Sequence, residues 1–260
     1  MKKIVVAPDS FKGSLTSAEV ADAVERGIKD VFPQCNVVKA GVADGGEGTV
    51  EAIVKAVGGD MYAASVTDPL GRPIKAAYGI VRSGGVKTAV MEMSAASGLP
   101  LLLPDELNPW ITSTYGTGEM ISDALNRGCR KFLVGIGGSA TNDAGTGMLS
   151  ALGVRFLDSR GQRLKGCGKD LESIARIDMS SLMPAARESE FIVACDVNTP
   201  FCGPDGAARV FAPQKGADPQ TAEALDRGMR SFARVIAGQF QTDIVQVGGQ
   251  AVLGRQGRES

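Results

Sequence analysis

The sequence contains no histidine among its 260 residues. This absence excludes Ser-His-Asp and Cys-His catalytic triads, histidine-ligated metal centres and phosphohistidine intermediates. Any acid–base chemistry must therefore be carried by Asp, Glu, Lys, Tyr or Cys side chains. The chain is 43% hydrophobic and 22% charged, which is ordinary for a soluble globular protein and excludes an intrinsically disordered one.

Cysteine, net charge and long apolar runs are also scarce. The five cysteines are widely spaced and form no C-x-x-C pair, which argues against a disulfide framework or a zinc site. A net charge of −1 argues against nucleic acid as a main partner, because neutralising its phosphates needs a basic face. No apolar run approaches the roughly 20 residues that cross a bilayer, and the apolar stretch after Lys2 and Lys3 is too short for a signal peptide. We therefore expect a cytoplasmic protein without a nucleic-acid or membrane partner.

Glycine, by contrast, is abundant, with 34 residues gathered mainly in a few short segments. Between these segments, residues 1–60 have the strand–helix–strand–helix order that is typical of a parallel sheet. Residues 61–92 then change to three strands joined by tight turns, which indicates the start of a second domain near residue 62. The predicted strands are residues 3–8, 36–40, 61–67, 74–81, 86–92, 131–136 and 190–195, and the predicted helices are residues 17–32, 50–57, 119–126, 144–152 and 220–237.

The first loop that could carry chemistry follows the strand predicted at residues 3–8. It contains Asp9, Ser10, Lys12 and Ser14, at the end of a strand where α/β folds place ligands. A carboxylate suits a metal ion, hydroxyls suit hydrogen bonds and an amine suits the charge of a phosphate. A polar turn with a solvated lysine explains the same residues equally well.

A second loop, residues 42–49, has the sequence VADGGEGT. Gly45 and Gly46 free the backbone N–H groups to point at an anion, and Asp44 lies beside them at the predicted end of the second strand. A flexible connector is the alternative interpretation.

Residues 135–147 form the richest loop, between an apolar strand and a helix. Its N–H groups and the helix dipole can both face a phosphate, although the loop lacks the G-K-[ST] ending of a Walker A motif. Gly135, Gly137 and Ala140 fit G-x-G-x-x-A, and Asp158 follows downstream, which is a loose dinucleotide fingerprint. We favour a nucleotide or substrate phosphate over a dinucleotide or a structural turn. The candidate binding residues are Gly137, Gly138, Ser139, Thr141, Asn142 and Asp143.

Two further candidates lie downstream. Asp196 stands at the end of the strand predicted at residues 190–195, a usual place for a functional carboxylate. Lys215 follows a turn stiffened by Pro213. On spacing alone, Asp196 is equally compatible with a buried capping role.

Secondary candidates are Glu92 with Ser94 and Ser97, and the segment 114–119. In that segment we predict that Thr117 is a helix N-cap, because hydroxyl side chains are favoured there.

Taken together, these segments resemble the bacterial glycerate kinase family that acts without a Walker motif. The resemblance is collinear from residue 2 to about residue 247, with a departure at residues 198–201 (NTPF), where the family tends to have Asn-Pro-Leu. The matching stretches are residues 7–12 (APDSFK), 42–49 (VADGGEGT), 116–119 (GTGE), 135–143 (GIGGSATND), 194–197 (ACDV) and 213–217 (PQKGA).

The resemblance implies transfer of the γ-phosphoryl group of ATP to D-glycerate with Mg²⁺, with 2-phosphoglycerate as the favoured product. It also implies an α/β fold of two domains. Residues 1–62 would be the first part of a flavodoxin-like domain, which is interrupted by a mixed α/β domain at residues 63–247 and completed by a C-terminal third.

The C-terminal residues 248–260 (GGQAVLGRQGRES) do not resemble that third. Back-translated with GC-rich codons and read two bases later, this tail gives a Gly- and Ala-rich stretch of the family's kind. We interpret it as an aberrant, frameshifted tail, and resequencing the DNA tests this. Without the C-terminal strands a strand edge and a sheet face would be exposed, so we expect lower stability and association into a homo-oligomer.

Phosphoryl transfer depends mainly on positioning and charge neutralisation. We expect Asp196 to act as the catalytic base, with Asp44 or Asp9 as the rival base, and either Asp44 or Asp196 as the Mg²⁺ ligand. Lys12 and Lys215 would stabilise the transferring group, and residues 137–143 would hold nucleotide phosphate or the glycerate carboxylate.

Two other functions stay open at this point. One is a truncated family member that binds a ligand but has no catalytic activity. The other is a dinucleotide-dependent oxidoreductase, for which the G-x-G-x-x-A match is the evidence.

Overall fold

The computed structural model describes residues 3–8, 14–15, 17–39, 48–195 and 198–245. Its centre is a five-stranded sheet of order β3-β4-β5-β6-β9. The strands are β3 (Gly59–Thr67), β4 (Pro73–Ser83), β5 (Val86–Glu92), β6 (Lys131–Gly135) and β9 (Glu190–Ala194). β3, β4 and β5 form the expected antiparallel meander, and β6 and β9 continue the sheet parallel to β5.

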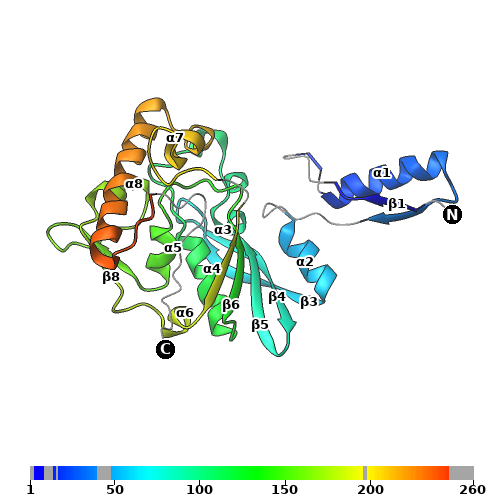
Figure 1. The fold of residues 1–260 in the computed structure, drawn as a ribbon, viewed down its shortest axis with the longest axis horizontal. Helices are drawn as coiled ribbons and strands as arrows, with labels where there is room; N and C mark the ends of the chain where they lie inside the picture. Colours follow the sequence, from blue (N-terminus) through cyan, green and yellow to red (C-terminus); the bar gives the residue numbers. More distant parts are fainter. Residues whose placement is uncertain (1–2, 9–13, 16, 40–47, 196–197, 246–260) are drawn as a thin grey trace.

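Helices cover both faces of this sheet, with α4 (Tyr115–Asn126) on one face and α2 (Thr49–Val57) on the other (Figure 1). Side chains along a strand alternate between the two faces. In β4, Tyr78 and Ile80 join the apolar core that α4 lines. Gly79, between them, faces α2 instead, and the missing side chain lets the helix lie directly on the strand.

This close approach predicts that a Gly79→Ala substitution displaces α2. A Cβ at this position would clash with Cγ2 of Val54 and lie 3.2 Å from Cγ1 of Val50. Overpacking of this kind costs about 1–3 kcal/mol, so thermal unfolding should show a melting temperature several degrees lower. The control is Gly238→Ala in α8 (Pro219–Phe240), where a Cβ meets nothing within 4 Å and alanine favours the helix. Equal melting temperatures for the two variants would contradict this account.

The first elements form a separate unit that lies apart from the five-stranded sheet (Figure 1). β1 (Lys3–Val6) pairs in parallel with β2 (Asn36–Lys39), and α1 (Ser17–Val31) connects them, which confirms the predicted strand–helix–strand order. Val5 and Val38 are partners in this pair and are 60% and 37% exposed. The two-stranded sheet therefore presents apolar side chains to solvent.

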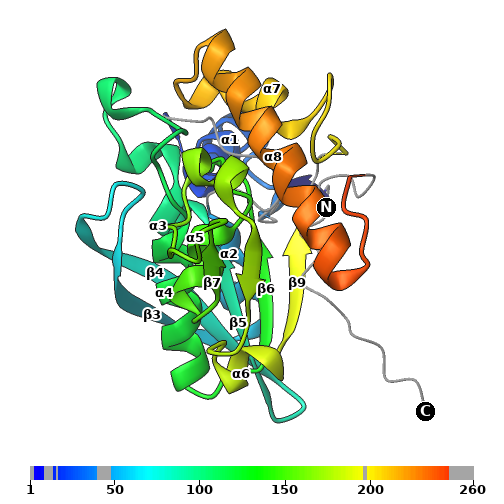
Figure 2. The same ribbon diagram turned by 90° about the vertical axis from the view of Figure 1, so that its left-hand side faces the viewer.

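A second apolar core lies beside the five-stranded sheet. α8 packs there against α7 (Ala207–Phe211), as the orange helix in Figure 2 shows. β7 (Arg155–Leu157) and β8 (Arg176–Asp178) form a separate antiparallel pair. The remaining short elements are α3 (Ser94–Ser97), α5 (Thr146–Ala151), α6 (Pro184–Arg187) and the 3-10 turns Leu99–Leu101, Pro104–Glu106, Gly168–Ser173 and Pro213–Lys215.

The α/β class predicted from the sequence is confirmed. The domain division at residue 62 stays a prediction. α2, which lies before that boundary in the sequence, packs on the five-stranded sheet through Val50 and Val54. Within the described residues, none of the helices combines the length and apolar character that crossing a membrane requires.

Candidate functional site

The carboxyl ends of three parallel strands meet at one edge of the five-stranded sheet. Glu92 ends β5, Gly135 ends β6 and Ala194 ends β9, and the three residues are partners across the sheet. Ligands of α/β sheets bind outside such carboxyl ends. The candidate loop at residues 135–147 begins in the middle of this row, and Asp196 follows β9 in the sequence.

That loop has an exposed first part. Gly138 is exposed and has a φ of +69°, a conformation that glycine adopts without strain. The Leu99 N–H donates to the Gly138 carbonyl at 2.9 Å, and the Ala140 N–H donates to the Ser97 carbonyl at 2.8 Å. The turn through Gly137, Gly138 and Ser139 is therefore held against the segment that follows β5, and Gly138 is open to solvent.

The second part of the loop is buried. Thr141, Asn142 and Asp143 are 5%, 9% and 1% exposed. Their side chains face the protein interior, and Nδ2 of Asn142 donates to the Met229 sulfur at 3.4 Å. Of the six loop residues predicted to bind a ligand, these three therefore anchor the loop, and Gly137, Gly138 and Ser139 are the more accessible ones.

Lys215 joins this loop from far along the chain. Its Nζ donates to the Ser139 hydroxyl at 2.8 Å and to the Thr141 carbonyl at 2.6 Å. The side chain is buried, with 7% of the residue exposed. Two segments that the sequence analysis singled out separately therefore meet, and a cationic group lies directly beside the glycine-rich turn.

Burial lowers the pKa of Lys215 to about 8, and the negative charge of Asp143 opposes this shift. At neutral pH the amine is still mostly protonated and carries a positive charge. Because burial disfavours the charged form of Lys215, an anionic partner beside the amine would stabilise that charged form.

The lowered pKa predicts how stability depends on pH. Between pH 8 and the ordinary lysine value of 10.5, the unfolded chain holds more protons on Lys215 than the folded chain. The free energy of unfolding that Lys215 contributes therefore rises with pH across this window and is constant below it. Urea denaturation of the protein and of Lys215→Met at pH 7.5, 9 and 10 measures this contribution as the difference between the two. A difference that stays constant from pH 7.5 to pH 10 would contradict the pKa.

Asp143 organises the buried half of the loop. Its Oδ2 accepts hydrogen bonds from the Thr114 N–H at 2.8 Å, the Thr114 hydroxyl at 2.8 Å and the Gly147 N–H at 3.2 Å. Its Oδ1 accepts from the Gly145 N–H at 3.1 Å. Burial raises the pKa of Asp143, and these donors oppose the rise. The carboxylate thus ties the start of α4 to the start of α5.

The other predicted site residues are distributed unevenly. Ser14 lies exposed in a turn before α1. The positions that lie outside the described residues are Asp9, Ser10, Lys12, Asp44, Gly45, Gly46 and Asp196.

The residues predicted to bind Mg²⁺, Asp44 and Asp196, lie outside the described residues. Among the residues that the structure describes, no group of three or more Asp, Glu, Cys or His side chains could hold a metal ion. The Asp143 carboxylate is occupied by hydrogen bonds from Ser113, Thr114, Gly145 and Gly147. The expectation that Asp44 or Asp196 binds Mg²⁺ stays a prediction.

The dinucleotide fingerprint does not have the structural context that it requires. Asp158 follows β7, which pairs with β8 in a separate sheet and not with β6. The Asp158 carboxylate accepts the N–H groups of Arg160 and Gln162 within a turn, at 2.9 and 2.8 Å. We therefore assign it a structural role.

The prediction that Thr117 is an N-cap is wrong. α4 begins at Tyr115, and Thr117 lies inside its first turn with no exposed surface. Its hydroxyl is hydrogen-bonded to that of Ser97 at 2.7 Å. This contact joins α4 to the segment after β5, and sequence spacing alone gives no signal for it.

Sequence reasoning also missed Thr112. Its side chain is fully buried, and its hydroxyl donates to the Ala140 carbonyl at 2.8 Å. This hydrogen bond holds the glycine-rich loop against the segment before α4. In the sequence, only the run of polar residues before α4 marks that segment.

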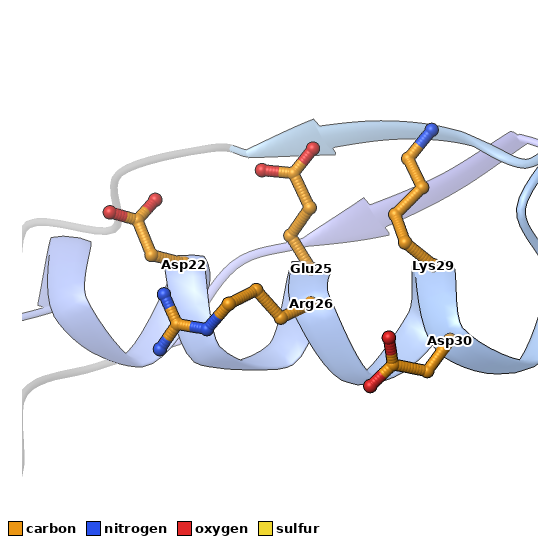
Figure 3. A pocket seen from close by; sticks show the side chains of 5 residues that line it. All are labelled: Asp22, Glu25, Arg26, Lys29 and Asp30. Carbon is orange, nitrogen blue, oxygen red and sulfur yellow. The ribbon is translucent and has the colours of Figure 1, made fainter.

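A charged groove on α1 is a surface feature separate from this edge. Figure 3 shows Asp22, Glu25 and Lys29 along one side of the helix, with Arg26 and Asp30 beside them. Nζ of Lys39 on β2 forms ion pairs with Asp22 at 2.6 Å and with Glu25 at 2.9 Å. Such solvated pairs contribute little stability, and we assign no chemistry to the groove.

Comparison with known proteins identifies the relatives of this chain. The glycerate kinase family model matches residues 4–257. Glycerate kinase from Haemophilus influenzae is 47% identical over 98% of this chain, and glycerate kinase from Bacillus subtilis is 50% identical over 89%. Glycerate 2-kinase from Escherichia coli is 45% identical over 98% of the chain. The chain spans 67%, 60% and 66% of the lengths of these three relatives.

The fold agrees with these similarities. A crystal structure described as that of a candidate glycerate kinase 2 from Salmonella typhimurium superimposes with a TM-score of 0.82 at 45% identity. The superposition covers 95% of this chain and 66% of the other. The family match extends into residues 248–260, whose interpretation as a frameshifted tail stays a prediction. The length of the match, the sequence identity and the shared fold together show that the chain belongs to the glycerate kinase family.

Proposed function

We propose that the protein transfers the γ-phosphoryl group of ATP to a hydroxyl of D-glycerate, with 2-phosphoglycerate as the favoured product. Family membership supports this reaction class. The observation that carries it in the structure is the contact of Lys215 with Ser139 and Thr141, which puts a buried cation against a solvent-accessible glycine turn at the carboxyl edge of the sheet. Phosphoryl transfer needs this combination of positioning and positive charge.

Lys215 would act on the transferring group. An ammonium has three N–H donors, and two of them are used by Ser139 and Thr141 within the described residues. The third is then available for a phosphate oxygen. Because this amine is largely desolvated before substrate binds, its attraction to the charge of the transition state is stronger than it would be in water.

The glycine turn would bind an anion through its backbone. The turn through Gly137, Gly138 and Ser139 suits either a nucleotide phosphate or the glycerate carboxylate, because glycine allows a close approach to the main chain. The buried residues Thr141, Asn142 and Asp143 would keep it rigid, so that little reorganisation is needed on binding.

Asp196 would accept the proton of the glycerate hydroxyl. As the bond from that oxygen to the γ-phosphorus forms, the bond from phosphorus to the β–γ bridging oxygen breaks, and ADP leaves. Mg²⁺, held by Asp44 or Asp196, would neutralise phosphate charge. Near-normal turnover in an Asp196→Asn variant would disprove the assignment of the base.

A coupled ADP-release assay with Mg-ATP and D-glycerate tests the proposal, with the Escherichia coli relative as positive control. ADP release that depends on D-glycerate and stops on addition of EDTA supports it. Thermal stabilisation by Mg-ATP without turnover would favour a binding protein that has no catalytic activity. Stabilisation by NAD but not by Mg-ATP would favour the oxidoreductase.

A further inference from the structure

Glu92 is a buried carboxylate to which the reaction above assigns no role. It ends β5, is 8% exposed and lies opposite Gly135, where the glycine-rich loop begins. Its Oε1 accepts a hydrogen bond from the Val50 N–H at 3.0 Å, across 42 residues of sequence. Val50 lies in the first turn of α2. The side chain therefore connects the row of strand ends to the beginning of a helix.

α2 lacks a cap of its own at this end. Its N-cap residue is Gly48, which has a φ of +92° and no side chain that could accept a hydrogen bond. The first N–H groups of a helix have no intrahelical partner and need an acceptor from elsewhere. A carboxylate is the most favourable acceptor, because the helix dipole is positive at the N-terminus. Glu92 supplies that acceptor.

The body of α2 is fixed independently. Val50 and Val54 pack on Val90 of β5, and Val54 lies over Gly79. The Glu92 bond is therefore not needed to hold the helix on the sheet. The hydrogen bond from Val50 acts instead on the first turn of α2.

We propose that Glu92 is a positioning residue for phosphoryl transfer. By capping α2 it fixes Gly48, Thr49 and Val50 relative to Gly135. The predicted binding residues Asp44, Gly45 and Gly46 come just before Gly48 in the sequence, so we expect the fixed position of Gly48 to matter for their action. This inference rests on the proposed function, because it assigns a role in that reaction.

The test compares three variants by steady-state kinetics and by hydrogen exchange of the first α2 turn. Glu92→Ala removes the acceptor. Glu92→Gln keeps an oxygen at the same reach without the charge, and Glu92→Asp keeps the charge but is one methylene too short. If the position of the acceptor matters, Glu92→Ala lowers kcat by about 10- to 100-fold, and its α2 amides exchange faster. Glu92→Gln then recovers more activity than Glu92→Asp.

Gln239→Ala is the matched control. The Gln239 side chain also ties a helix to a backbone, with the Ile177 N–H donating to its oxygen at 2.7 Å and its amide donating to the Ile177 carbonyl at 3.1 Å. It lies near the end of α8 remote from Lys215 in sequence. Its loss should lower the melting temperature and leave kcat within about twofold of the parent value.

Two results would overturn the role of Glu92. One is a kcat for Glu92→Ala that is unchanged, as expected for Gln239→Ala, because Glu92 would then be structural only. The other is higher activity in Glu92→Asp than in Glu92→Gln, because charge and not position would then be decisive. The unsubstituted protein is assayed first, so that a lack of turnover there counts against the proposed function and is not confused with an effect of Glu92.

Discussion

A Lys215→Met variant is expected to lose at least about 100-fold in turnover with Mg-ATP and D-glycerate while remaining folded. The loss of one preorganised donor to a developing charge costs on the order of 10²–10³ in kcat. Here the lost donor is also a buried cation in contact with the glycine turn, with its Nζ 2.8 Å from the Ser139 hydroxyl. The effect should therefore appear in kcat more than in KM.

The stability of the Lys215→Met variant should increase or stay nearly unchanged. Methionine has a similar length, and it removes a buried amine whose pKa is lowered to about 8 by desolvation. Removing that penalty offsets the loss of the hydrogen bonds to Ser139 and Thr141. We expect a melting temperature near pH 7 that is equal to or above that of the parent protein. A residue that lowers stability and raises activity is typical of a functional site.

Lys87→Met is the matched control for this substitution. Its Nζ also donates to a main-chain carbonyl, that of Arg127, at 2.7 Å. It lies near the start of β5, at the edge of the sheet opposite Glu92. Lys87→Met should keep turnover within about twofold of the parent. If Lys215→Met did the same, the proposed role of the Lys215 cation would be wrong.

The fold was predictable where the hydrophobic pattern is long and periodic. The helix predicted at residues 220–237 is α8, and the meander at residues 61–92 is β3, β4 and β5. β7 and β8 were missed, because three residues are too few to show an alternating pattern. The start of α4 was placed too late, because tertiary contacts bury Gly116 and Thr117 inside the helix, where spacing suggested a cap.

The residue types of the candidate site could be named from the sequence, but their arrangement could not. Glycine and polar residues after a strand marked the loop at residues 135–147, and a turn stiffened by Pro213 marked Lys215. Sequence could not show that Lys215 and Ser139, 76 positions apart, form a hydrogen bond. Nor could it distinguish Ser139, at the exposed turn, from Asp143, which is 1% exposed, because both stand in the same polar run. Burial decides that difference, and burial depends on the packing of distant segments.

An Asp143→Ala variant is expected to lose the most stability of any substitution considered. Alanine leaves the N–H groups of Thr114, Gly145 and Gly147 without their acceptor, in a position with no access to water. Each buried unsatisfied donor costs about 1–3 kcal/mol, so the free energy of unfolding should fall by at least about 3 kcal/mol. Asp143→Asn should cost less, since its one remaining oxygen can satisfy the donors on one side only.

Turnover should fall together with stability in both variants, because the glycine turn is built on this anchor. Asp158→Ala is the control, since Asp158 also accepts two backbone N–H groups but in a more exposed turn. Water can replace the carboxylate there, so the free energy of unfolding should fall by about 1 kcal/mol or less. Urea denaturation and ADP release measured on the same samples separate the possibilities. If Asp143→Asn kept full stability but lost turnover, Asp143 would contact the substrate directly, and the division of the loop into an accessible turn and a buried anchor would be wrong.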